Sequence, residues 1–99
     1  MIIFHPKAEQ EYAEAINYYK EINTELGNRF KKSIKNILSN IQQSPKIYPF
    51  VDSEIQKAVS IKFPYIVLFA KQNKYTIILA IFHTKRDIKN LKRDIKDIN

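Results

Sequence analysis

Several residue types are scarce or missing in this chain of 99 residues, and each absence excludes a class of protein. There is no cysteine, which excludes disulfide bonds, thiolate metal sites and a cysteine nucleophile. There is a single glycine, so the chain has no glycine-rich loop of the kind that cradles phosphates or dinucleotides. The two histidines, His5 and His83, lie far apart and lack the spacing of metal ligands. We therefore expect neither a metal nor another cofactor.

Long apolar runs are also absent. No uninterrupted apolar stretch approaches the roughly 18 residues that a membrane helix needs. The first residues carry no basic region followed by a long apolar core, so no signal peptide is recognisable. Repeats, low-complexity tracts and linkers are missing too. We expect one cytoplasmic domain over residues 1–99 that does not enter a membrane.

The charge is strongly of one sign, with a formal net charge of +7. It is uneven, because residues 51–99 hold ten of the 17 Lys and Arg against five acids, whereas residues 1–50 hold seven against five. Such a field favours anionic partners, which are either nucleic acid or an acidic protein.

Two amphipathic helices are expected over residues 6–43. Pro6 suits a first helical turn, which needs no backbone donor at that position. Asn23 can cap a second helix, and Pro45 follows its end. Apolar residues recur at helical spacing in both: Ala8, Tyr12, Ala15, Ile16 and Tyr19, then Leu26, Phe30, Ile34, Ile37, Leu38 and Ile41. The two helices should form an αα-hairpin.

Strands are expected at residues 1–4 and, as an antiparallel meander, over residues 55–83. From residue 55 the period changes to two. One face, mainly apolar, would carry Ile55, Lys57, Val59, Ile61 and Phe63, and the other Gln56, Ala58, Ser60 and Lys62. The stretches 65–70 and 75–82 are apolar on both faces and should be central strands, joined by a polar turn at Gln72-Asn73.

The last segment predicts a short amphipathic helix over residues 88–98. Its narrow apolar stripe consists of Ile88, Leu91, Ile95 and Ile98. The helices 6–43 can cover one face of the sheet, and this stripe can cover part of the other, either docked or swung away. An apolar sheet face left exposed would mark a protein partner. The expected fold class is therefore α+β.

The last strand ends in His83-Thr84-Lys85-Arg86-Asp87, which brings an imidazole and two cations to a strand terminus. Strand ends on a rigid sheet are common places for a functional site.

The order of these elements resembles the toxins of the RelE/ParE superfamily, from bacterial type II toxin–antitoxin modules. The resemblance covers about residues 2–88 and favours the ParE-like, plasmid-stabilisation branch. The matching pieces are Pro6-Lys7-Ala8-Glu9, Tyr18-Tyr19, Leu26-Gly27 with Arg29-Phe30, Ser44-Pro45, Tyr48-Pro49, Phe63-Pro64-Tyr65 and Phe82 to Asp87. The resemblance implies a toxin that inhibits growth until an antitoxin with an acidic or amphipathic C-terminal segment binds it. Operator DNA would be contacted only through the antitoxin, in a hetero-oligomer.

Two toxin mechanisms follow from the resemblance. Relatives of the RelE type cut mRNA on the ribosome, and here the chemistry would fall to His83 as the proton carrier and Glu54 as the base. The cations that stabilise phosphate would be Lys57, Lys62, Lys85 and Arg86. Two features depart from the nuclease pattern: no aromatic residue follows the last strand, and lysine stands where an arginine is usual.

Relatives of the ParE type inhibit DNA gyrase without catalysis, and this is the favoured interpretation. On either interpretation the target-binding residues would be Lys57, Lys62, His83, Lys85 and Arg86. The antitoxin-binding residues would be Tyr18, Tyr19, Ile88, Leu91 and Ile95, with one of the two tyrosines in the core. A third hypothesis is a basic nucleic-acid-binding module that stacks bases on its six Tyr and six Phe, although most of these stand at core spacing.

Overall fold

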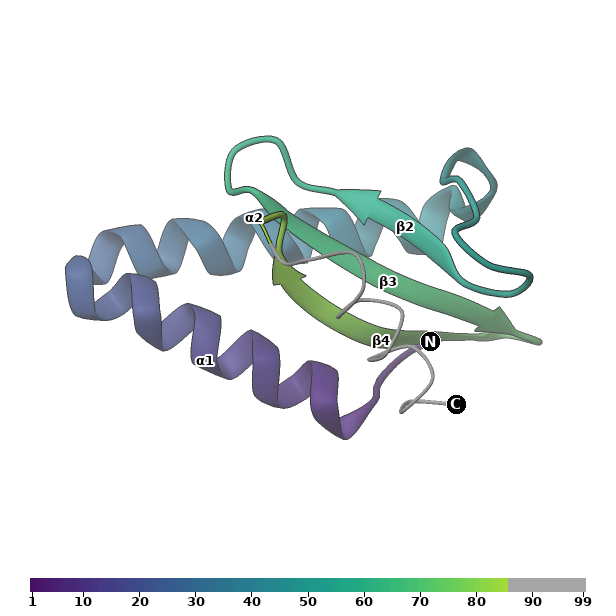
Figure 1. Cartoon of the computed structure of the whole chain (residues 1–99), viewed down its shortest axis with the longest axis horizontal. Coiled ribbons are helices and arrows are strands. Elements are labelled where there is room, and N and C mark those ends of the chain that lie inside the picture. The colour runs from purple at the N-terminus through teal and green to yellow at the C-terminus, as the bar shows by residue number, and fades with distance from the viewer. Residues whose placement is uncertain (86–99) are drawn as a thin grey trace.

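The computed structural model describes residues 1–85, so Arg86 and the expected helix over residues 88–98 lie outside the described residues. The described elements follow the order β1 (Ile2–Phe4), α1 (Pro6–Ile22), α2 (Thr24–Gln43), the 3₁₀ turn η1 (Pro45–Ile47), β2 (Gln56–Val59), β3 (Tyr65–Gln72) and β4 (Tyr75–His83). Figure 1 shows α2 passing behind the twisted sheet and α1 lying below it in this view. Within residues 1–85, none of the helices combines the length and apolar character needed to span a bilayer.

The helical hairpin is confirmed, and side chains define where each helix begins. His5 caps α1, because its Nδ1 accepts a hydrogen bond from the backbone N–H of Lys7 at 3.1 Å. Asn23 caps α2, because its Oδ1 accepts from the N–H groups of Glu25 at 2.8 Å and Leu26 at 3.3 Å. These bonds satisfy donors that a helix start otherwise leaves unpaired. One residue thus separates the two helices.

The sheet has four strands in the order β1-β4-β3-β2. The expected antiparallel meander of β2, β3 and β4 is present, with a tight turn in which Asn73 adopts a φ of 56°. The N-terminal strand also belongs to this sheet, because β1 pairs in parallel with β4 from Ile2 opposite Thr76 to Phe4 opposite Ile78. The sheet is therefore mixed rather than a purely antiparallel meander.

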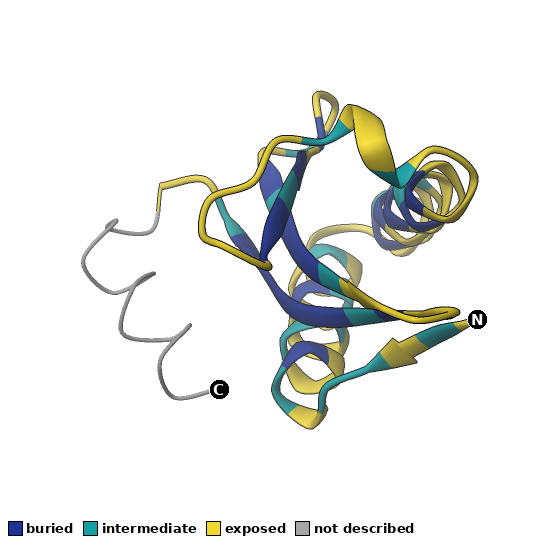
Figure 2. Cartoon of the chain, turned by 90° about the vertical axis from the view of Figure 1, so that its right-hand side faces the viewer, coloured by how far each residue is buried: buried dark blue, intermediate teal, exposed yellow. Residues whose placement is uncertain are grey.

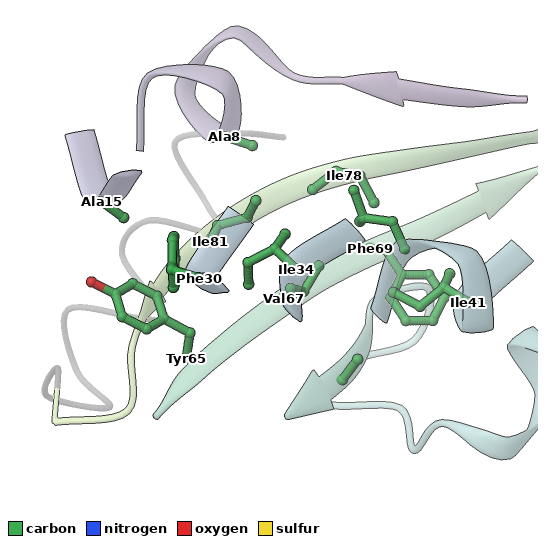
Figure 3. Packing of buried hydrophobic residues seen from close by; sticks show 12 residues of the cluster. Ala8, Ala15, Phe30, Ile34, Ile41, Tyr65, Val67, Phe69, Ile78 and Ile81 are labelled. Carbon is green, nitrogen blue, oxygen red and sulfur yellow. The ribbon is translucent and has the colours of Figure 1, made fainter. Parts of the chain in front are cut away.

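Both helices cover the same face of the sheet, and the main core lies between the helices and that face (Figures 2 and 3). The largest fully buried side chains of this cluster come from α2, β3 and β4: Phe30, Ile34, Ile41, Val67, Phe69, Ile78 and Ile81. Removing each such side chain from water contributes about 1.5–3 kcal/mol to the stability of the fold.

The two predicted faces of β2 are present, and the structure shows which of them meets the helices. The polar series turns to the helices: Gln56 is 4% exposed, Ala58 1% and Ser60 5%, whereas Val59 is 51% exposed and Ile61 98%. The reason is hydrogen bonding. The Gln56 amide donates to the carbonyls of Pro45 at 2.7 Å and Tyr48 at 3.1 Å, and the hydroxyls of Ser60 and Ser33 lie 3.3 Å apart. Buried partners make polar side chains acceptable in the interior.

A second apolar cluster lies on the sheet face turned away from the helices. It consists of Ile55, Leu68, Leu79, Ala80 and Phe82, with Ile66, Ala70 and Ile77 against it. Leu79 belongs to it because the pairing of β3 with β4 shifts register between Leu68 and Phe69. Both faces of the two central strands are thus apolar, as their sequence predicts.

Candidate target- and partner-binding surfaces

His83 stands at the end of β4 and faces the helix side of the sheet. Its ring centroid lies 5.4 Å from that of Tyr65, its partner in the β3–β4 register, in a T-shaped contact. Its Nδ1 accepts a hydrogen bond from the backbone N–H of Lys85 at 3.1 Å. Since one ring nitrogen is occupied by this turn, Nε2 is the atom with which His83 can bind another molecule.

Two further tyrosines adjoin His83 and Tyr65. The ring of Tyr19 lies 6.2 Å from that of Tyr65, and the ring of Tyr18 lies 5.2 Å from that of Tyr19. Burial, and after it the neighbouring Tyr19 and Tyr18, raises the pKa of Tyr65 to about 12. The Tyr65 phenol therefore keeps its proton at neutral pH and does not act as a base there.

Two predicted basic residues lie at the same end of the sheet. The N–H of Thr84 donates to the carbonyl of Pro64 at 2.7 Å, which ties the end of β4 to the loop that carries Lys62. Lys62 and Lys85 are both exposed. His83, Lys62 and Lys85 thus lie at one end of the molecule.

Lys57 and Glu54 do not join this group. Lys57 pairs with Leu68 and so points to the face away from the helices, whereas His83 points toward them. Glu54 lines a hollow with Ala70, Lys71 and Gln72, at the far end of β3 from the position that pairs with His83. At about 3.3 Å per strand residue, the hollow that Glu54 lines is roughly 20 Å along β3 from the position that pairs with His83. The predicted nuclease set is therefore not one site, because strand pairing distributes it over two faces and two ends.

The predicted antitoxin-binding tyrosines divide between surface and core. Tyr18 is 60% exposed, whereas Tyr19 packs against Phe30 at 4.9 Å and Phe63 at 5.1 Å between ring centroids. Of the two tyrosines, Tyr18 is therefore the one whose side chain is exposed to a partner. The other predicted residues of this set, Ile88, Leu91 and Ile95, lie outside the described residues.

Most aromatic rings of the described residues serve the core rather than a base-stacking surface. Phe30, Phe63, Tyr65 and Tyr19 contact one another, and Tyr48 contacts Phe69 with ring centroids 5.8 Å apart. Rings packed edge to face in this way have no free face for a nucleobase. The arrangement disfavours the third hypothesis.

A basic groove that the sequence interpretation missed runs between α2 and β2. Its volume is about 840 Å³. Arg29, Lys32, Asn36 and Asn40 line it from α2, and residues 58–63 line it from the opposite side. A sequence signal was present, because these four polar residues recur every three or four positions beside the apolar stripe of the helix. Lys62, one of the predicted binding residues, lies on this groove.

Within residues 1–85, no three His, Asp or Glu side chains come together in a way that would hold a metal ion. The chemistry available at these surfaces is that of a few cations, one imidazole and neutral phenols. Such groups bind anions and hydrogen-bond acceptors.

Comparisons with known proteins agree with the fold and the element order. The family model described as ParE toxin of type II toxin-antitoxin system, parDE, matches residues 2–88. A chain of the solved structure "Chromosomal ParDE TA system from P. aeruginosa" superposes with a TM-score of 0.74 at 17% identity, over 85% of this chain and 95% of that chain. Among curated proteins, no significant match was found. Since the family model spans most of the chain, this protein belongs to the ParE toxin family of type II toxin–antitoxin systems.

Proposed function

We propose that this chain is a toxin that arrests growth by binding DNA gyrase without catalysing a reaction, and that an antitoxin neutralises it in a hetero-oligomer. Membership of the ParE toxin family supports the toxin role. DNA gyrase is cytoplasmic in bacteria, so the toxin would act in the cytoplasm. Contact with operator DNA would be made by the antitoxin.

The observation that carries the non-catalytic mechanism is the separation of the residues that a nuclease would need. A general base works only within hydrogen-bond reach of the proton that it removes. Glu54 lies at the opposite end of β3 from His83, and Lys57 lies on the opposite face. A binding inhibitor requires no such constellation, so its mechanism is compatible with this arrangement.

The test begins with controlled expression in bacteria and the purified protein. We expect growth arrest, loss of supercoiling activity in a gyrase assay, and accumulation of cleaved DNA. The same preparation should leave mRNA intact in an in vitro translation reaction read by primer extension. Ribosome-dependent mRNA cuts together with normal gyrase activity would overturn the proposal.

Two variants separate binding from catalysis. Glu54→Gln and His83→Gln should keep their folds, since both side chains lie at the surface or half-buried. If the mechanism is inhibition by binding, Glu54→Gln should arrest growth as the wild type does. His83→Gln should reduce the potency of growth arrest only moderately, as expected when one contact is lost. Loss of a proton carrier would instead lower the rate of a catalysed reaction by about 10²–10⁴. Abolished mRNA cleavage in both variants would instead establish a nuclease.

A further inference from the structure

An exposed apolar pair lies on α1 near the turn that joins the two helices. Tyr18 and Ile22 are each 60% exposed, and their spacing of four residues makes them neighbours on the helix surface. Figure 1 shows this end of the helical hairpin projecting beyond the strands of the sheet. The residues that line the α2–β2 groove all fall within residues 26–63, so α1 takes no part in it. The pair is therefore a surface separate from the basic groove.

Two contacts of α1 determine which way the pair points. Lys20 lies against Gly27 of α2, so that side of the helix is covered. Glu11, seven residues before Tyr18, lies on the same flank as Tyr18, and its carboxylate accepts a backbone N–H of β4 at 3.0 Å. Tyr18 and Ile22 thus belong to the flank of α1 that is turned away from α2.

The charge around the pair is opposite in sign to that of the whole chain. The formal net charge is +7, yet the five acidic residues of residues 1–50 all fall on α1 and the first turn of α2: Glu9, Glu11, Glu14, Glu21 and Glu25. Residues 26–50 hold five Lys and Arg and no acid. Glu14 and Glu21 are exposed, about one turn before and one turn after Tyr18. These carboxylates repel phosphate and attract Lys and Arg, so the surface disfavours nucleic acid and suits a basic protein.

We propose that this α1 face, formed by Tyr18 and Ile22 between Glu14 and Glu21, binds a basic protein surface that has an apolar centre. Tyrosine is among the residues that contribute most to protein interfaces, and a rim of charge around an apolar pair selects the partner. Lys and Arg of the partner would meet the two carboxylates, while its apolar centre would contact Tyr18 and Ile22.

The identity of the partner rests on the proposed function, in which it is the target, DNA gyrase. An enzyme that acts on DNA presents Lys and Arg to the phosphates, so it carries basic surface. Most of this toxin would be repelled by such a surface, and the α1 face is the part that would be attracted. The inference therefore assigns Tyr18 to target binding. An acidic antitoxin segment would be repelled by Glu14 and Glu21.

The apolar pair is tested with the purified full chain and purified gyrase subunits by biolayer interferometry. Tyr18→Ala combined with Ile22→Ala should weaken binding at least about tenfold. Ile47→Ala combined with Phe50→Ala is the matched control, since these side chains are 70% and 63% exposed at a different place. The control should bind as the wild type does. Equal losses in the two double variants would overturn the site.

The carboxylates are tested without changing Tyr18 or Ile22. Glu14→Lys combined with Glu21→Lys should weaken binding at least about tenfold at about 50 mM salt, and less at about 300 mM, where charges are screened. Glu9→Lys combined with Asp52→Lys is the control, because it changes the net charge equally at exposed positions off the α1 face. Equal losses would reduce the effect to net charge and contradict the proposal. Circular dichroism and thermal unfolding verify that each variant is folded.

Growth arrest separates this inference from the proposed function. If gyrase is inhibited equally by the wild type and by the folded Tyr18/Ile22 variant, the inference is overturned and the proposed function stands. If the wild type neither binds nor inhibits gyrase, the proposed function is overturned, and growth arrest alone tests the α1 face. A folded Tyr18/Ile22 variant that arrests growth as the wild type does would then overturn the inference. Loss of arrest in that variant, but not in the Ile47/Phe50 control, would support the α1 face as the contact with a different target.

Other occupants of the α1 face give distinct results. If sedimentation shows a homodimer that dissociates in the Tyr18/Ile22 variant, the face belongs to a second copy of the chain. If duplex DNA alone binds the wild type and not this variant, the face binds nucleic acid. Either result overturns the assignment to a basic protein partner.

Discussion

The pKa of Tyr65, raised to about 12 from an ordinary 10.0, couples the stability of the fold to pH. Below pH 10 the phenol is neutral in both folded and unfolded chains, and its contribution to the free energy of unfolding is fully present. Between about 10 and 12 the unfolded chain loses the proton while the folded chain keeps it, so stability falls as pH rises.

This prediction is checked by urea denaturation of wild type and Tyr65→Phe at several values from about pH 8 to about pH 11. The free-energy difference between the two proteins should shrink as pH rises. Some alkaline loss should remain in the variant, because burial also raises the pKa of Tyr12 and Tyr19. A difference that stays constant over the range would show that the Tyr65 phenol does not titrate differently in the two states.

Gly27 of α2 lies against Lys20 of α1, where an added side chain has no room. A Cβ at this position would collide with Cγ of Lys20 and would lie 3.1 Å from the backbone N and Cα of that residue. Gly27→Ala should therefore destabilise the fold by about 1–3 kcal/mol through overpacking, although alanine is ordinarily the better helix residue.

Urea denaturation measures this cost, and Ser39→Ala is the control on an exposed position of the same helix. That control should change the unfolding free energy by less than about 0.5 kcal/mol. A Gly27→Ala variant as stable as the wild type would mean that the helices separate without cost.

At the scale of elements, the helices follow from local signals and the pairing of strands does not. His5 and Asn23 cap helices that begin at the next residue, and the apolar residues of each helix recur within one turn of one another. The facing of β2 depends instead on acceptors in the preceding loop, at Pro45 and Tyr48, which bind Gln56. Alternation alone does not tell which face of β2 meets the helices, because hydrophobicity is a poor guide where a polar side chain finds buried partners.

A contact between α1 and β4 illustrates such non-local bonding. β1 pairs with β4 as far as Ile78, and beyond it the carboxylate of Glu11 accepts the N–H of Ile81 at 3.0 Å. Ile81 is only 1% exposed. Glu11→Ala should cost about 1–3 kcal/mol, since a buried donor loses its acceptor.

The matched control is Glu14→Ala, which removes an exposed carboxylate of the same helix that accepts from Gln10. It should change stability by less than about 0.5 kcal/mol in urea denaturation. Glu11→Gln should lie between the two, because an amide oxygen still accepts. If Glu11→Ala and Glu14→Ala cost the same, the bond to Ile81 contributes nothing.

At the scale of the whole molecule, the second apolar face of the sheet is the feature that the described residues leave without an assigned partner element. The predicted amphipathic stripe of residues 88–98 stays a prediction. If it covers Leu68, Leu79 and Phe82, Leu91→Ser with Ile95→Ser should lower the unfolding free energy by about 2 kcal/mol or more.

Lys92→Ser with Lys96→Ser is the control, because it changes the same segment off the stripe. It should leave both stability and the binding of a hydrophobic dye close to wild type, whereas the stripe variant should bind more dye. Equal behaviour of the two variants would show that the stripe does not protect the sheet.

The amino-acid sequence by itself determined the class of the fold, the helical hairpin, the two central strands and the basic character of the chain. These follow from periodicity, caps and composition, which act over a few neighbouring residues. Tertiary structure alone decided that β1 joins β4 in parallel, that Lys57 and Glu54 lie apart from His83, and that Arg29 and Lys32 face a free strand edge. Those outcomes depend on register and on which side chains find buried hydrogen-bond partners, and both are set by residues far apart in the chain.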